Sequence, residues 1–347
     1  MISLARESRG VTQEDLALRL GVTQGKVSKL EAGLLAASAE TVAALSRELR
    51  YPPDFFYQTE HRFGLGPAEF YHYRKKKSVS SQALTKHHAR IDIKRIHVTR
   101  LLDGLDAHHD AQFPQFDVDD FGGDSQEMAR AVRATWHMPA GPIRNLTKLV
   151  EAAGGVVMHH DFENHRVDAI SRFVPPLPPL FFMNSNVGGA RYRFSLSHDV
   201  CHVVAHRTPT PTMEEEADRF AAEFLMPAAE IRPHLAHLTL QRAATLAAQW
   251  RVSLVAIVKR AADLGKLSGP EAERLWMEIG RAGYRRKEPP ELDFPVEQPT
   301  VMQEMFATYQ KKLGYSTKDI SRLLILNEDE FAEVYGDARG RLRLIRE

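Results

Sequence analysis

The chain has one cysteine, almost no net charge and no long apolar segment, and each shortage excludes a class of protein. Cys201 is the single cysteine among 347 residues, so no internal disulfide can form, as is typical of a reducing compartment. No stretch reaches the roughly 20 apolar residues that cross a bilayer, and the opening MISLARESRG lacks the regions of a secretory signal. A formal net charge of +1 allows only local contacts with nucleic acid. We therefore expect a cytoplasmic protein with no membrane-embedded part.

Two short helices are predicted near the N-terminus, in VTQEDLALRLGVTQGKVSKLEAG. Thr12 with Asp15, and Thr23 further on, are residue types that cap helix starts, and Gly21 supplies the turn between the helices. The apolar residues have the spacing that packs the pair together: Leu16, Leu20, Val22, Val27 and Leu30. The segment therefore indicates a helix-turn-helix, with two helices of an ordinary bundle as the plainer alternative.

The second of these helices would present Gln24, Gly25, Ser28 and Lys29 to solvent, and Gln and Lys are able to pair with base edges or phosphates. The stretch LARESRGVTQEDLALRLGVTQGKVSKLEAG resembles the Cro/C1-type (XRE) repressor domain, a bundle of five helices that would occupy residues 1–60. Its later helices would lie at Ser38 to Leu49 and near Pro53 to Tyr57. The resemblance implies a double-stranded DNA operator, a homodimer, and contacts to DNA from Gln13, Thr23, Gln24, Gly25, Lys26, Ser28 and Lys29.

A basic stretch follows, from Arg62 to Arg100, where ten Lys or Arg side chains stand against only Glu69 and Asp92. We interpret residues 61–124 as a basic helical linker with a solvated face. Contact with DNA phosphates beside the helix-turn-helix is the alternative.

A candidate metal site begins in SLSHDVCHVVAH. His198 and His202 share one helix face at the spacing that lets two imidazoles reach one metal, and Asp199 stands where zinc peptidases place their catalytic carboxylate. The later segment EEEADRFAAEFLMP puts Glu214 and Asp218 together on one face of a second helix. Glu214 would complete a set of two His and one Glu, and Asp218 would hold the second ring nitrogen of a ligating His.

Several residues near this site have two interpretations. Glu215 and Glu216 compete with Glu214 as ligand, and all three acids also suit the start of a solvated helix. His206 is either a supporting residue or a surface residue, and Cys201 is interpreted as buried packing rather than a zinc or redox group. DAISRF is either the edge strand of a substrate cleft or a core strand. Arg191 and Arg193 either stabilise an oxyanion or pair with acids.

The segments GPIRNLTKLVEAAGGVVMHH, DAISRF, LFFMN, RYRFSLSHDVCHVVAH and EEEADRFAAEFLMP together resemble the ImmA/IrrE metallopeptidase family. The resemblance implies a small zincin-like α+β domain over residues 125–231, with a short sheet from about Gly155 to Asn184 and one zinc per chain, manganese being the alternative. His198, His202 and Glu214 would be ligands, and Asp199 would take the general base's place. The family's motif is HExxH, so this chain departs from it at Asp199, which is one methylene shorter.

The expected fold is therefore mainly α with a small α+β domain. The metallopeptidase domain would be followed by a helical extension at residues 232–285, and by a linker and C-terminal helical hairpin at 286–347. Two functions are open: a DNA-binding regulator whose zinc endopeptidase cleaves a partner repressor or itself in a stress, defence or mobile-element response, or a repressor or antitoxin-like protein whose peptidase fold is a weak or inactive metal or ligand sensor. They differ in the chemistry of Asp199 and Glu214.

Overall fold

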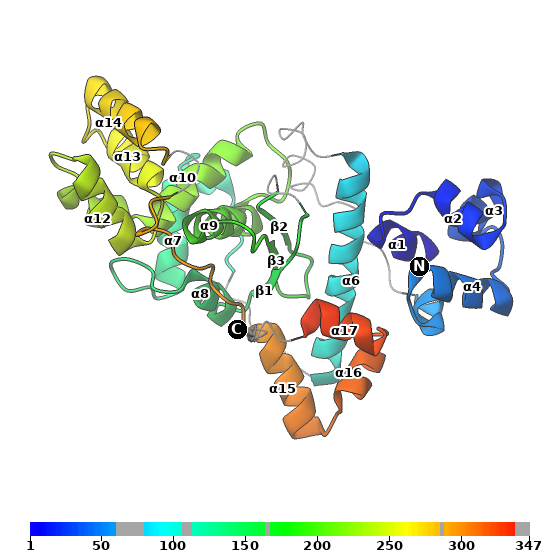
Figure 1. The fold of residues 1–347 in the computed structure, drawn as a ribbon. Helices are drawn as coiled ribbons and strands as arrows, with labels where there is room; N and C mark the ends of the chain where they lie inside the picture. Colours follow the sequence, from blue (N-terminus) through cyan, green and yellow to red (C-terminus); the bar gives the residue numbers. More distant parts are fainter. Residues whose placement is uncertain (60–79, 106–112, 164–166, 285–287, 337–347) are drawn as a thin grey trace, which may run out of the picture. The chain divides into compact units, whose positions relative to one another are not determined.

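A computed structural model gives the fold, and it describes residues 1–59, 80–105, 113–163, 167–284 and 288–336 (Figure 1). The chain divides into two compact units, each built from its own core. Among the described residues, the first unit contains 1–59, 80–105 and 303–336, and the second contains 113–163, 167–284 and 288–302. Part of the predicted basic linker, including the lysines at 75–77, lies outside the described residues.

The N-terminal part of the first unit is a bundle of four α-helices and one 3-10 helix, as the sequence predicts: α1 (Ile2–Ser8), α2 (Gln13–Leu20), α3 (Gln24–Glu31), α4 (Ala39–Leu49) and η1 (Pro53–Tyr57). Thr12 and Asp15 form the expected capping box, because each side chain bonds the other residue's backbone N–H. Gly21 ends α2 with φ of +65°, a left-handed conformation that costs glycine little, and α3 starts three residues later. The turn between α2 and α3 therefore follows from local sequence alone.

The first unit also takes helices from later in the chain: α6 (Ser81–Leu105), α15 (Val301–Leu313), α16 (Thr317–Leu323) and α17 (Glu328–Tyr335). The described part of the expected C-terminal hairpin thus forms three helices, and α17 contacts the N-terminal bundle, since Arg9 donates to Glu330 at 2.8 Å. Tyr309 packs so closely against Gly104 of α6 that a Cβ at this position would clash with the phenol oxygen. Both ends of the chain therefore build this unit.

The second unit contains the sheet and the remaining described helices: η2 (Val118–Phe121), α7 (Ser125–Thr135), α8 (Leu146–Ala152), β1 (Val156–His159), β2 (Ala169–Arg172), β3 (Leu180–Met183), α9 (Gly189–Ala205), α10 (Met213–Leu225), α11 (Ala228–Ile231), η3 (Arg232–His234), α12 (Leu240–Trp250), α13 (Leu254–Asp263) and α14 (Gly269–Arg281). The strand order is β1-β3-β2, with β1 parallel and β2 antiparallel to β3. β3 is buried along its whole length, as its run LFFM suggests, and β2 lies at an edge.

Helices α7, α9 and α10 contribute to the core of the second unit. α10 packs against α7 on one side and α9 on the other, and Phe220 and Phe224 stack within this core with ring centroids 5.5 Å apart. α9 also packs against β2. The polar faces of α9 and α10 meet because their apolar faces are fixed by this core.

The segment from 288 to 299, expected to be part of a linker, is instead packed onto the second unit. Glu297 is buried, accepts a hydrogen bond from the Thr147 backbone at 2.7 Å, and pairs with Arg193 of α9. Phe294 lies against Gly189, where an added Cβ would come within 2.5 Å of its ring. Its Pro and charged residues resemble a solvated linker, but their partners are distant in the sequence.

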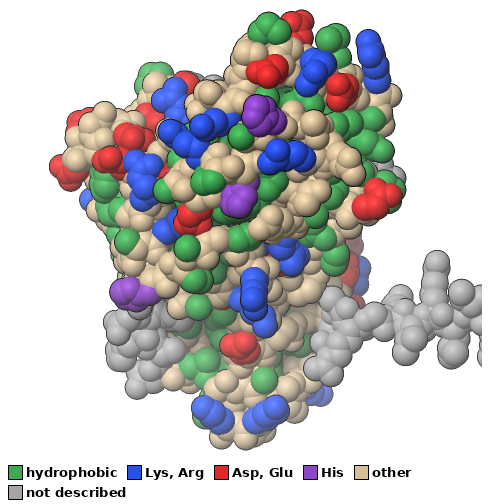
Figure 2. All heavy atoms as spheres, turned by 90° about the vertical axis from the view of Figure 1, so that its left-hand side faces the viewer, with side chains coloured by type: hydrophobic (Ala, Val, Ile, Leu, Met, Phe, Trp, Pro, Cys, Tyr) green, Lys and Arg blue, Asp and Glu red, His purple; other side chains and the backbone are tan. Residues whose placement is uncertain are grey.

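Charge is mixed on the face that Figure 2 presents, where Lys and Arg side chains are interspersed with Asp and Glu. This distribution agrees with the net charge of +1 over the whole chain. Within the described residues, every helix is too short or too polar to traverse a lipid bilayer.

Candidate functional site

α9 brings the two imidazoles of the predicted site together. Leu196, Val200 and Val204 bury the apolar face of this helix, which leaves His198 and His202 on its polar side, one turn apart. The Nε2 atoms of the two rings face each other at 3.0 Å. Zinc holds tetrahedral nitrogen ligands at about 2.0–2.1 Å, which separates two such nitrogens by roughly 3.3 Å, so the pair is preset to chelate one ion.

α10 adds the third donor, from its first turn. The Glu214 carboxylate lies 3.7 Å from His198 Nε2 and 3.6 Å from His202 Nε2. The three donor atoms all lie within 4.8 Å of one another. Two imidazole nitrogens and a carboxylate oxygen form a donor set that zinc accepts, so the residues present fit the metal that the sequence implies.

The other ring nitrogens also have partners, supplied largely by α10. His198 Nδ1 lies 3.0 Å from Asp218 Oδ1. His202 Nδ1 lies 2.8 Å from His206 Nδ1, and His206 Nε2 lies 2.9 Å from Glu216 Oε2. The rings of His198, His202 and His206 therefore form a row that ends on a carboxylate at each side.

The three consecutive glutamates have three different surroundings. Glu214 faces both Nε2 atoms, Glu216 contacts His206, and Glu215 pairs with Arg219 at the surface. The contact of His206 with Glu216 was missed by the sequence analysis, although the interval of four from His202 to His206 was a usable signal.

Burial and charge act in opposite directions on these rings. Burial lowers the pKa of His198, but the hydrogen bond to Asp218 and the charges of Asp199, Asp218 and Glu214 outweigh it, so this pKa is raised above 6.5. Burial also lowers the pKa of His206 below 6.5, although the hydrogen bond to Glu216 opposes the shift.

Asp199 and Cys201 are both buried on α9. Asp199 is 2% exposed and lies directly after His198, and its carboxylate contributes to the raised pKa of that ring. Burial raises the pKa of the Cys201 thiol well above 9.0, and the side chain belongs to the apolar core. Cys201 is therefore a packing residue, because its buried thiol does not readily ionise to the reactive thiolate.

The two arginines near the start of α9 contact acids and backbone carbonyls. Arg193 is fully buried, pairs with Glu297, and donates to the Ile143 carbonyl at 2.8 Å. Arg191 donates to Asp168 at 2.9 Å. These contacts favour the interpretation in which both arginines pair with acids.

The predicted DNA-reading surface lies on α3 and its N-terminal turn. Ser28 is half-buried. The other five residues of this surface are exposed: Thr23, Gln24, Gly25, Lys26 and Lys29. The Gln24 amide donates to Gln13 at 2.7 Å, and Gln13 donates to Glu31 at 2.7 Å, so the polar side chains that open α2 and α3 are held together. Val27 and Leu30 are buried beneath them.

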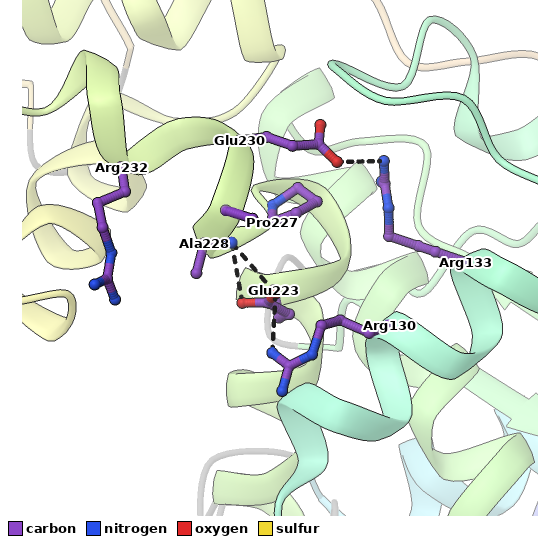
Figure 3. A pocket seen from close by; sticks show the side chains of 8 residues that line it. Arg130, Arg133, Glu223, Pro227, Ala228, Glu230 and Arg232 are labelled. Carbon is purple, nitrogen blue, oxygen red and sulfur yellow. Dashed lines mark hydrogen bonds and ion pairs between the residues drawn. The ribbon is translucent and has the colours of Figure 1, made fainter.

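A cavity of about 600 Å³ opens at the far end of α10 (Figure 3). Arg130 donates to Glu223, and Arg133 lies 3.6 Å from Glu230. Glu223 also pairs with Arg260 and accepts from the Ala228 backbone at 3.2 Å. Three arginines and two glutamates line this pocket, and Arg130 and Arg133 form ion pairs with Glu223 and Glu230.

Two family models match the chain in the order that the sequence predicts. Residues 2–56 match the helix-turn-helix family, and residues 150–262 match the peptidase family described as the IrrE N-terminal-like domain. The second match contains all the imidazoles and carboxylates of the row. No curated protein matches the chain significantly.

Proposed function

We propose that this chain, which combines a helix-turn-helix domain with an IrrE N-terminal-like domain, is a DNA-binding regulator with a zinc-dependent endopeptidase site. The observation that carries the proposal is the convergence of His198, His202 and Glu214, whose donor atoms lie within 4.8 Å of one another. Three protein ligands leave a fourth position for water, which is the arrangement of catalytic rather than structural zinc.

The residues around this site have separable roles. Zinc, or manganese in its place, would supply a Lewis acid that polarises a peptide carbonyl and the attacking water. Asp199 would accept a proton from that water, and Asp218 would hold the His198 ring in position. The edge of β2, the strand that packs against α9, offers backbone groups to an extended substrate chain.

The DNA-binding role rests on the exposed polar side of α3. Gln24, Gly25, Ser28 and Lys29 would face bases, Gln13 would contact phosphate, and the exposed Thr23 and Lys26 would belong to the same surface. A homodimer would place two such surfaces about one turn of DNA apart on an operator. The protein substrate would be a partner repressor or the chain itself, in a stress, defence or mobile-element response.

The shortened acid supports a second function. Asp199 lacks one methylene, roughly 1.5 Å of bond, and a misplacement of about 1 Å costs on the order of a hundredfold in rate. A repressor or antitoxin-like protein that binds metal as a sensor, with little or no turnover, would have the same ligands and need no general base.

Metal content and cleavage together test the two functions. Zinc and manganese would be measured per chain in the native protein, in Glu214→Gln, and in Glu215→Gln as the matched control. Candidate repressors would then be incubated with each protein, with and without chelator. Bound metal with chelator-sensitive cleavage supports the peptidase, and bound metal without cleavage supports the sensor. If the native protein holds no metal, or Glu214→Gln holds as much as the native chain, the ligand assignment is wrong.

A further inference from the structure

We propose that His206 and Glu216 are positioning residues that determine which nitrogen of His202 is left for the metal. The inference rests on the proposed function only in treating His202 as a ligand. Its geometry is independent of that, because His202 Nδ1 lies 2.8 Å from His206 Nδ1 and His206 Nε2 lies 2.9 Å from Glu216.

The proton order follows from the acid at the end of the row. An ionised carboxylate only accepts hydrogen bonds, so His206 must donate to Glu216 from Nε2. A neutral imidazole that donates from Nε2 accepts at Nδ1, and therefore His202 must donate from its own Nδ1. The lone pair of His202 is then on Nε2, the atom that faces His198 Nε2 at 3.0 Å.

This order decides whether the site is ready to bind a cation. Metals bind the unprotonated nitrogen of a neutral imidazole, so a proton on His202 Nε2 would block the site. The opposite direction of the His202–His206 bond would put that proton there. Glu216 thus acts on the metal site through two rings, while Glu214 and Asp218 from the same helix contact His198 directly.

The contacts of His206 with His202 and Glu216 are largely shielded from water. The side chains of His202 and His206 are 2% and 1% exposed, and that of Glu216 is 14% exposed, so water has little access to replace a lost partner. By contrast, the side chain of Asp218, which supports His198, is 49% exposed. We therefore expect loss of the His206 contact to weaken metal binding.

Three substitutions of His206 separate its hydrogen bond from its bulk. Asn carries its amide at the same distance from the backbone as Nδ1, and Gln carries its amide at that of Nε2. We expect His206→Gln and His206→Phe to weaken zinc binding by about 10–100-fold, the usual effect of removing a hydrogen-bond partner of a ligand. His206→Asn should retain most of the affinity, because its oxygen accepts from His202. Glu216→Met should weaken binding, and Glu215→Met, on the exposed neighbour, should leave it unchanged.

The measurements use the full chain. Zinc affinity is obtained by competition with a chelating dye, and nitrogen NMR of labelled histidine in the metal-free protein shows which ring atom carries the proton. The inference is supported if the His202 ring proton lies on Nδ1 in the native chain and no longer prefers Nδ1 in His206→Phe. Return of the proton to Nδ1 and of zinc affinity in His206→Asn would complete the support. Equal zinc affinities in the three His206 variants and in Glu216→Met, or a proton on His202 Nε2 in the native chain, overturn it. If the native protein binds no zinc, the proposed function fails while the NMR result still decides the proton order.

Discussion

Arg9 and Glu330 are joined by a hydrogen bond of 2.8 Å across 321 positions of the sequence. The same guanidinium lies over the Tyr51 ring, 4.2 Å from its centre. The last helices of the chain are therefore part of the unit that carries the helix-turn-helix. A neighbouring pair, Arg50 and Asp329, lies in the open, with side chains 66% and 65% exposed.

We expect Glu330→Gln to destabilise the first unit by about 1–2 kcal/mol, because a largely buried, charge-assisted hydrogen bond is lost. Asp329→Asn is the matched control and should cost less than about 0.5 kcal/mol, since exposed pairs contribute little. The three tryptophans lie at 136, 250 and 276 in the second unit, so hydrogen exchange of α1 and α17 is the appropriate measurement. Equal protection in both variants would contradict the expectation.

The first unit should lose stability as the pH falls below 6.5. Burial lowers the pKa of His97 to about 3, with further lowering by Arg100 and Lys94 and a small opposing effect of the Leu324 backbone, and the Tyr335 hydroxyl lies 2.7 Å from its Nδ1. The unfolded chain takes up this proton near pH 6.5 and the folded chain does not. Stability present above pH 6.5 is therefore lost toward pH 3, at about 1.4 kcal/mol per pH unit.

His97→Gln removes this proton uptake, so we expect the pH dependence of hydrogen exchange in α6 to flatten between pH 6 and 4. His234→Gln, at an exposed histidine of the second unit, serves as control. A slope that persists in His97→Gln would show that other groups cause it.

The pairing of Glu297 with Arg193 should be essential to the second unit. Both side chains are almost completely buried, at 3% and 0% exposure, so Glu297→Gln would leave a buried guanidinium uncompensated. We expect the free energy of unfolding to fall by about 3–5 kcal/mol. Unfolding in denaturant would be monitored by tryptophan fluorescence. Glu291→Gln, an exposed position in the same segment, should have no measurable effect. Similar midpoints for the two variants would mean that residues 288–299 are not held by this pair.

Asp199→Glu restores the longer acid, and if reach limits the reaction we expect cleavage of a susceptible repressor to rise by up to about a hundredfold. Asp263→Glu, the same change at an exposed site on α13, should leave the rate unaltered. Rates are compared at equal zinc occupancy. An inert Asp199→Glu protein would remove the general-base role of this position and favour the metal sensor.

Gln24→Ala should relax base preference more than it lowers general affinity for DNA, since a side chain paired with a base edge contributes about 1–3 kcal/mol of discrimination. Gln241→Ala, exposed on α12, is the matched control. Binding to a selected operator and to random duplex would be compared over a salt series, in which affinity falls as salt rises. Unchanged discrimination in Gln24→Ala, or a complex indifferent to salt, would contradict the DNA-reading surface.

Local patterns in the sequence determined the boundaries of several helices and the placement of side chains on one helix face. Thr12, Asp15 and Gly21 fix the start and end of α2 through bonds within a few residues, and the interval between His198 and His202 places two imidazoles on one helix face. Such features are set by backbone geometry over one or two helical turns, so they can be read without the rest of the fold.

Tertiary structure alone decided the pairings between distant residues. Three adjacent glutamates are chemically alike, and only the packing of α10 against α9 sends Glu214 to the Nε2 atoms and Glu216 to His206. Glu297 and Glu330 appear in the sequence as ordinary surface acids, yet they meet Arg193 and Arg9 across 104 and 321 positions. The physical reason is that the partner of a carboxylate depends on which apolar faces pack together in the core. The spacing of residues within one helix or strand does not determine which distant elements pack together.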